Sequence, residues 1–425
     1  MGTIPDTRAV VDWITSYRVS RVAVVGGGFI GLEMTENLKK RDMAVTIIEM
    51  QHHVMPVIDP EMAAFIHGHL QSQGVELCLG SPVKAFGKAG KEGLSILLEN
   101  GNSVPADMVI LAMGVRPRIE LASSSGLSIG KRGGIQVNGQ MQTSDANIWA
   151  VGDAVEVDNI VSGKKDLIPL AGPANRQGRI AAESILGLNP DKCRFRGVQG
   201  TAVCGILGMT VASTGITEKR LNQGGDDGLR DSYEKIYLHP DHHAAYYPDA
   251  KTITIKLIFS KTDGRILGAQ AVGQEGVEKR IDVISMAIQN GGTVFDLEEA
   301  ELCYAPQYGS AKDPVNLAGM IAANVIKGYL TVSHWEDMDD PDIFILDVRD
   351  KDEFEEGHVP HAVNIPLNTL RSNLERLPRD REIRTYCYVG QRSYFATRIL
   401  IQKGFRASNL SGGFLMYQAV KKILK

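Results

Sequence analysis

The chain has 425 residues, of which 43% are hydrophobic and 23% are charged, and its net charge is −4 at pH 7. This composition excludes a disordered chain, the length predicts roughly three domains, and the lack of a dense basic block argues against a nucleic-acid partner. No apolar run reaches the ~18 residues of a membrane span, and the first residues lack a signal-peptide pattern. With five scattered cysteines, we therefore expect a soluble cytoplasmic protein without membrane contacts.

A glycine-rich turn follows the first predicted strand. Residues 21–25 (RVAVV) form a short apolar run, and GGGFIG, an amphipathic stretch and a second strand-like run, AVTIIE, come next. This order predicts a βαβ unit that binds a dinucleotide, with a purely structural turn as the alternative. Gly26 would make the tight turn, Gly28 would let backbone amides approach the pyrophosphate, and Gly31 would let the helix pack on the strand.

Glu49 closes the second strand of this unit, 23 residues after Gly26. An acid at about this spacing accepts hydrogen bonds from a free ribose 2′-hydroxyl and repels a 2′-phosphate. NADH is therefore favoured over NADPH. Strand-like segments ELCLG, LSILLE and ADMVILAMG follow, and they predict a meander that completes the unit near Gly114, which we count with the cofactor-binding glycines.

The middle of the chain carries a second glycine–acid pair. The segment TSDANIWAVGDA contains Gly152 and Asp153, and LAGPANRQGRIAAESI predicts a helix that starts near Pro173. These segments resemble the second FAD-contact region of two-dinucleotide-binding-domain flavoprotein reductases. The resemblance implies that Asp153 accepts hydrogen bonds from the ribityl hydroxyls, and that the helix directs its positive end toward the flavin pyrimidine.

The resemblance continues through HHAAYYPDA, EGVEKRIDV and YAPQYGSAKDPVN, which look like the dimerisation domain of coenzyme A-disulfide reductases. It implies a homodimer in which Tyr247 and Tyr304 reach across the interface to the thiol–disulfide site of the partner. From the residues alone, both tyrosines are aromatics in turn-rich segments, and that alternative stays open. In the same region, EKRIDVISMAIQNG predicts a helix.

Members of this family begin with a Rossmann unit that binds FAD and bears a redox cysteine. This sequence has one GxGxxG motif, and its first cysteine is Cys78, so we expect the FAD half-domain to be missing and residues 1–18 to be a linker from it. Cys78 and Cys204 lie in apolar strands, where thiols are mostly inert. Cys193 is expected to be exposed between basic residues, and Cys303 is the remaining candidate for a redox thiol.

The last quarter of the chain has a specific combination of motifs. IFILDVRDKDEFEEGHVPHAVNIP followed by TYCYVGQRS resembles single-domain rhodaneses, and the whole chain resembles fused coenzyme A-disulfide reductase–rhodanese proteins, also described as persulfide or polysulfide reductases. Cys387 opens a six-residue loop whose amides would form an anion-binding nest, with Arg392 adding positive charge. Such a loop would hold a transferred sulfur as a persulfide. Asp347, Arg349 and His358 are expected to stabilise the fold.

We therefore predict an α/β protein that combines a truncated Rossmann-type flavoprotein core, an α+β dimerisation domain and a C-terminal rhodanese domain. The expected activity is NAD(P)H-dependent reduction of persulfides, polysulfides or coenzyme A disulfides through FAD. A flavin-free sulfurtransferase on a redox-inactive body and a non-catalytic interaction remnant are the alternatives. No metal ligands are predicted. The expected parts are a linker (1–18), an NAD(P)H domain (19–113), the remainder of an FAD domain (114–190), a dimerisation domain (191–330) and the rhodanese domain (331–425).

Overall fold

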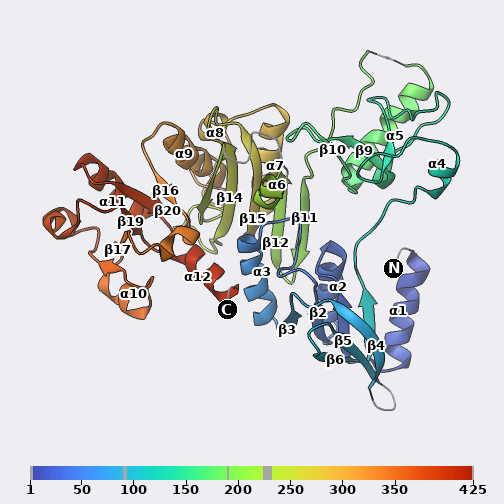
Figure 1. Ribbon diagram of the computed structural model, residues 1–425, viewed down its shortest axis with the longest axis horizontal. Coiled ribbons are helices and arrows are strands. Elements are labelled where there is room, and N and C mark those ends of the chain that lie inside the picture. The colour runs from blue at the N-terminus through green and yellow to red at the C-terminus, as the bar shows by residue number, and fades with distance from the viewer. Residues whose placement is uncertain (1–2, 90–92, 189–190, 224–231, 424–425) are drawn as a thin grey trace.

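The structure of the chain is a computed structural model that describes residues 3–89, 93–188, 191–223 and 232–423. Figure 1 shows four bodies, which we name by their elements: a nucleotide body (α1–α3, β1–β7), a connecting body (α4, α5, β8–β10), a central body (β11–β15, α6–α9) and a C-terminal body (β16–β20, α10–α12). The mixed α/β architecture that the sequence predicts is confirmed.

The nucleotide body is built on a parallel sheet of order β3-β2-β1-β7, as the predicted βαβ opening requires. Residues 1–18, predicted as a linker, contain a helix with a capping box from Thr3. The predicted meander is wrong in part: ELCLG and ADMVILAMG supply β3 and β7 of the parallel sheet, and the antiparallel meander is β4-β5-β6. The elements are α1 (Ile4–Ser16), β1 (Arg21–Val25), α2 (Phe29–Lys39), β2 (Ala44–Ile48), α3 (Pro60–Ser72), β3 (Val75–Cys78), β4 (Val83–Ala89), β5 (Gly93–Leu98), β6 (Ser103–Ala106) and β7 (Met108–Leu111).

The connecting body has a small sheet of order β10-β9-β8 beside the helix α5. Its apolar core gathers side chains from the sheet, from α5 and from the loops around them, including Met141 and Phe195. The elements are α4 (Glu120–Ser124), β8 (Ile135–Gln136), the short 3-10 helix η1 (Gly152–Ala154), β9 (Val155–Asp158), β10 (Lys165–Asp166) and α5 (Ala171–Ile185).

The central body is a five-stranded antiparallel sheet of order β11-β12-β15-β14-β13. Every residue of β14 and β15 is buried, because helices cover the sheet and the two strands lie inside it. The helix predicted from EKRIDVISMAIQNG is confirmed as α7. The elements are β11 (Ala202–Ile206), β12 (Met209–Gly215), α6 (Glu218–Gln223), β13 (Tyr233–Leu238), β14 (Ile253–Ser260), β15 (Ile266–Gly273), α7 (Val277–Gln289), α8 (Val294–Glu298) and α9 (Pro314–Ile326).

The C-terminal body is a parallel sheet of order β16-β20-β19-β17-β18 with helices around it. The strands end at one edge, so the loop that follows β19 starts there. The elements are β16 (Val332–Ser333), η2 (Trp335–Asp339), β17 (Phe344–Asp347), α10 (Lys351–Glu356), β18 (Val363–Asn364), η3 (Leu370–Ser372), η4 (Leu374–Arg376), β19 (Ile383–Tyr386), α11 (Gln391–Gln402), β20 (Ala407–Leu410) and α12 (Gly413–Ile423).

Helix α12 joins the C-terminal body to the rest of the chain, and Figure 1 shows it beside α3. Met416 and Val420 of α12 are buried in an apolar cluster with residues of α3 and of the central sheet. The backbone amide of Tyr237 donates to the hydroxyl of Ser411, just before α12, at 2.8 Å. The nucleotide, central and C-terminal bodies therefore share one packed junction. Among the residues that the structure describes, no helix is both long and apolar enough to cross a membrane.

Candidate functional site

The loop between β1 and α2 has the geometry of a dinucleotide cradle. Gly26 has a φ of +110°, and a Cβ there would lie 2.2 Å from the carbonyl oxygen of Ala112. A Cβ on Gly31 would lie 1.9 Å from the carbonyl oxygen of Gly26, so the helix packs on the turn only with glycine. Gly28, at the amino terminus of α2, meets no atom within 4 Å of an added Cβ. This open space beside the free amides of α2 fits a pyrophosphate.

Glu49 lies directly after β2, next to this cradle. Its carboxylate accepts hydrogen bonds from the backbone amides of Gly27 at 2.7 Å and Gln51 at 2.8 Å. The residue is only 8% exposed, so the carboxylate shapes the glycine loop from within. Gly114, which follows β7 with a φ of +90°, has open space around it. The nucleotide-binding roles of Glu49 and Gly114 remain predictions.

The second glycine–acid pair lies in η1, against the start of α5. Gly152 has a φ of +84°, and its amide donates to Gln177 of α5 at 2.7 Å. Asp153 is exposed. The helix begins at Ala171, two residues before the predicted start, so Pro173 lies in its first turn. The pair and the amino end of α5 are thus brought together, which fits one side of a flavin and leaves the ribityl role of Asp153 a prediction.

The two predicted tyrosines lie on the surface of the central body. Tyr304 is 51% exposed and Tyr247 is 42% exposed. The hydroxyl of Tyr304 lies 3.2 Å from that of Tyr246, which the sequence analysis missed although it precedes Tyr247 in the same YY pair. Tyr247 makes an edge contact with the ring of His243. Exposed phenols at this position remain candidates for contact with a second chain.

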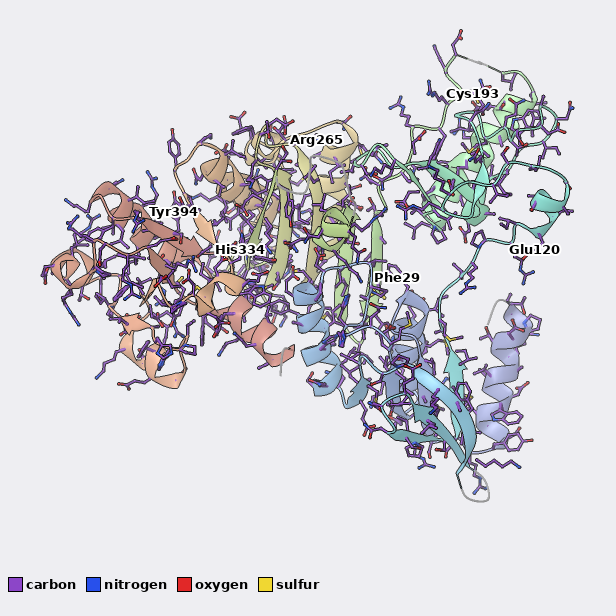
Figure 2. All side chains as sticks on the ribbon, in the orientation of Figure 1. Phe29, Glu120, Cys193, Arg265, His334 and Tyr394 are labelled. Atoms are coloured by element: carbon purple, nitrogen blue, oxygen red, sulfur yellow. The ribbon has the colours of Figure 1, made fainter. Side chains whose placement is uncertain are left out.

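Of the cysteines outside the C-terminal body, one was misjudged. Cys193 is 2% exposed rather than open to solvent, and burial raises the pKa of its thiol; Figure 2 shows it among the side chains of the connecting body. The reason is that the thiol turns inward and donates to the carbonyl of Ile180. Burial also raises the pKa of Cys78, and that of Cys204 to about 12, whereas Cys303 is exposed.

Cys387 directly follows β19 and is 1% exposed. Its Sγ accepts a hydrogen bond from the backbone amide of Gly390 at 3.2 Å, and the hydroxyl of Ser393 lies 3.5 Å away. Gly390 has a φ of +99° and caps α11, so the positive end of this helix faces the sulfur. The loop therefore stabilises a negative sulfur. Ser393 was missed, although it follows Arg392 directly in the motif.

Arg392, which the sequence predicts to add positive charge near Cys387, is held by an acidic partner. Its guanidinium forms a two-point contact with the carboxylate of Glu353 in α10, with N–O distances of 2.6 and 2.7 Å. Asp350 lies 3.5 Å from the same guanidinium. The charge of Arg392 is thus balanced by α10, a segment 39 residues away in sequence whose proximity no local pattern indicates.

Asp347, Arg349 and His358 make contacts that stabilise the fold, as expected. The carboxylate of Asp347 is fully buried and binds the guanidinium of Arg349, with the shortest N–O distance at 2.6 Å. Arg349 also lies over the ring of Phe414 in α12. His358 stacks on Phe354 and bonds to its carbonyl oxygen. These contacts lie in the segments of β17, α10 and α12.

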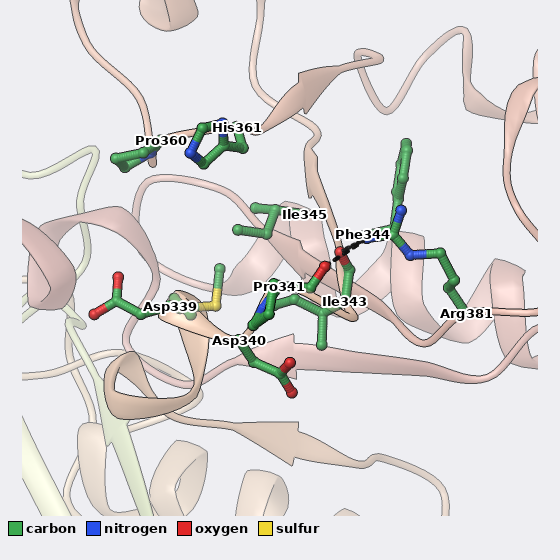
Figure 3. A pocket seen from close by; sticks show the side chains of 10 residues that line it. Asp339, Asp340, Pro341, Ile343, Phe344, Ile345, Pro360, His361 and Arg381 are labelled. Carbon is green, nitrogen blue, oxygen red and sulfur yellow. Dashed lines mark hydrogen bonds between the residues drawn. The ribbon is translucent and has the colours of Figure 1, made fainter.

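A pocket of about 550 Å³ in the C-terminal body lies away from this chemistry (Figure 3). It is lined by Phe344, at the amino end of β17, whereas Cys387 follows the carboxyl end of the parallel strand β19. Its Arg381 donates to backbone carbonyls, and its Asp339 is paired with Lys421. We therefore assign the reactive site to the Cys387 loop and not to this pocket.

Comparison with known proteins agrees with this division of the chain. The pyridine nucleotide-disulphide oxidoreductase family model matches residues 3–178, its dimerisation-domain model matches residues 201–313, and the rhodanese-like domain model matches residues 331–419. An NADH oxidase of Methanocaldococcus jannaschii is 39% identical over 317 residues, which are 74% of this chain and 68% of that protein. The chain belongs to the pyridine nucleotide-disulphide oxidoreductase family.

Two solved structures extend the similarity of this oxidoreductase to its C-terminal body. Reduced CoADR-RHD of Bacillus anthracis has 42% sequence identity and a TM-score of 0.95, covering 99% of this chain and 74% of its own. An NAD-dependent persulfide reductase from A. fulgidus has 38% identity and a TM-score of 0.88, covering 98% of this chain and 74% of its own. The predicted family, including the rhodanese fusion, is confirmed.

Proposed function

We propose that this chain takes part in the NAD(P)H-dependent reduction of persulfides, polysulfides or coenzyme A disulfides, with Cys387 as the carrier of sulfane sulfur. The observation that carries the proposal is the placement of Cys387 Sγ against the amide of Gly390 at the start of α11, in a chain that also has an open dinucleotide cradle at Gly28. The names of the two similar solved structures agree with this substrate class.

Each body has a task in this proposal. The amides at the start of α2 hold the pyrophosphate of NADH or NADPH, and Glu49 favours the free ribose of NADH. Asp153 and the first turn of α5 hold the flavin. When bound, the nucleotide and FAD would supply the reducing electrons for thiol–disulfide chemistry. Cys387 attacks the outer sulfur of a donor, and the amide of Gly390 stabilises the negative charge on Sγ before the transfer.

The central body would form a homodimer in which Tyr247 and Tyr304 face the partner. The matched dimerisation-domain model and the exposure of both tyrosines support this assembly. The same proposal includes the domain limits given above and coenzyme A as a ligand. It also includes a cytoplasmic location, because all five cysteines are free thiols.

Intact-mass analysis of the full chain tests the carrier role. After exposure to glutathione persulfide and alkylation of free thiols, we expect a gain of ~32 Da on the chain, which is one sulfur. Cys387→Ser should remove this gain, while Cys303→Ser, which changes the exposed thiol, should retain it. A gain of the same size on Cys387→Ser would contradict the proposal. Consumption of NADH that depends on the persulfide would distinguish the reductase from a flavin-free sulfurtransferase.

A further inference from the structure

The amino end of α10 contacts the Cys387 loop at Arg392. Glu353 of this helix binds the guanidinium of Arg392 through both carboxylate oxygens, at 2.6 and 2.7 Å. One of these oxygens also accepts the backbone amide of Asp350 at 3.1 Å, as part of the capping box of α10. Glu353 is therefore anchored at two places, and it holds Arg392 in one orientation.

The charges around Arg392 do not favour a doubly charged anion. Hydrogen bonding to Arg392 keeps the pKa of Glu353 below its usual value, so the carboxylate is ionised at neutral pH. The single positive charge of Arg392 then faces two negative ones, from Glu353 and Asp350. The nearby Arg349 is neutralised by its own pair with Asp347. Attraction to an anion comes mainly from the Gly390 amide and the end of α11.

We propose that Glu353 is a specificity-determining residue that makes Cys387 select organic persulfides over thiosulfate. The inference rests on the proposed carrier role of Cys387. A hydropersulfide presents at most one negative charge on its sulfur atoms, whereas thiosulfate presents two negative charges beside its transferable sulfur. With Arg392 bound by Glu353, the loop has no free cation to balance the second charge of thiosulfate, and the carboxylates of Glu353 and Asp350 repel it.

Both donors react by the same displacement and differ in their charge and leaving group. The thiolate of Cys387 attacks the outer sulfur, a bond forms between Sγ and that sulfur, and the S–S bond of the donor breaks. From a hydropersulfide, the electron pair leaves with the thiolate of the donor, and the proton stays on the new persulfide. From thiosulfate, the electron pair leaves with sulfite. Neither step needs a further oxidant or reductant.

The test is the donor preference of Glu353→Gln in the full chain. Glutamine keeps the capping interaction with Asp350 and removes the charge, which frees Arg392 for an anion. We expect kcat/KM for thiosulfate to rise ~10-fold, mostly through KM, while that for glutathione persulfide changes less than about two-fold. The gain should shrink with added salt, because screening weakens the restored attraction. Glu353→Asp, which keeps the charge, should retain the preference of the native chain.

Glu355→Gln is the matched control, because Glu355 lies exposed on the same helix and pairs with Lys351 and not with Arg392. It should leave the ratio of the two donors unchanged. An unchanged ratio in Glu353→Gln, or an equal rise for both donors, would overturn the inference about Glu353. Failure of Cys387 to gain sulfur from either donor in the native chain would instead overturn the carrier role itself, so the two failures are distinguishable.

Discussion

Lys256 is buried where the nucleotide body meets the central body, and its replacement by methionine tests what holds them together. The ammonium group is 0% exposed and contacts three carboxylates: Asp59 at 2.8 Å, Glu218 at 2.7 Å, and Glu61. One carboxylate oxygen from each of these three acids lies within 4.8 Å of the other two. The hydroxyl of Tyr237 donates to Glu61 at 2.8 Å, so the cluster reaches the strand against which α12 packs.

Lys256→Met removes the one charge that all three carboxylates share. Breaking a buried ion pair by deleting one partner costs about 3–5 kcal/mol, because the remaining charges stay buried without compensation. Here three acids would be left close together, and we expect a loss in this range at pH 7 for the junction between the two bodies. Methionine has a similar volume, so a cavity contributes little to the effect.

The loss should depend on pH in a defined direction. Burial alone would raise the pKa of Glu218, but the ammonium groups of Lys256 and Lys235 outweigh it and lower this pKa to about 2. The pKa of Asp59 is lowered too, against the effect of burial, chiefly by Lys256. A carboxyl group whose pKa is lowered by folding stabilises the folded state at pH values above its ordinary pKa. This stabilisation is lost as the pH falls toward the lowered pKa. The difference between native chain and variant should therefore be full at pH 7 and shrink below about pH 4.

Urea unfolding followed by amide hydrogen exchange in β14 and α3 measures the effect at the junction itself. Lys261→Met is the control, because Lys261 follows the same strand and is exposed. At pH 7, we expect the amides of Lys256→Met to exchange at lower urea concentrations than those of the control. The urea midpoint of unfolding should also be lower for Lys256→Met. Equal midpoints at pH 7, or a difference that grows toward pH 4, would refute the reasoning.

Four more outcomes are expected. Gly28→Ala should fold normally and bind NADH ~10-fold more weakly in a fluorescence titration, because its methyl group would enter the space for the pyrophosphate. Gly31→Ala should instead lose both binding and helical circular dichroism, since its Cβ would lie 1.9 Å from the carbonyl oxygen of Gly26; native-like spectra would contradict this. Glu49→Gln should narrow a preference for NADH over NADPH, measured as a ratio of dissociation constants. Light scattering should give twice the chain mass of 46.2 kDa, and a monomer at micromolar concentration would contradict the dimer.

Local sequence patterns predicted the structure correctly where the structure depends on neighbouring residues. The strand–glycine–helix order predicted β1, the loop and α2, because the tight turn and close packing are properties of adjacent residues. The Cys387 loop was recognised for the same reason, since a strand end, a left-handed glycine and a helix start lie within six residues. Segment 76–80 was assigned to the wrong sheet, because a short apolar run does not indicate which strand it pairs with.

The family, the order of bodies, the glycine-rich loop after β1 and the place of Cys387, the proposed sulfur carrier, could all be predicted from local sequence patterns. Which charged groups meet could not be predicted in this way. The pairing of Arg392 with Glu353 and the buried carboxylates around Lys256 join segments far apart in the chain. The physical reason is that an electrostatic environment depends on distance and burial, and long-range packing determines both.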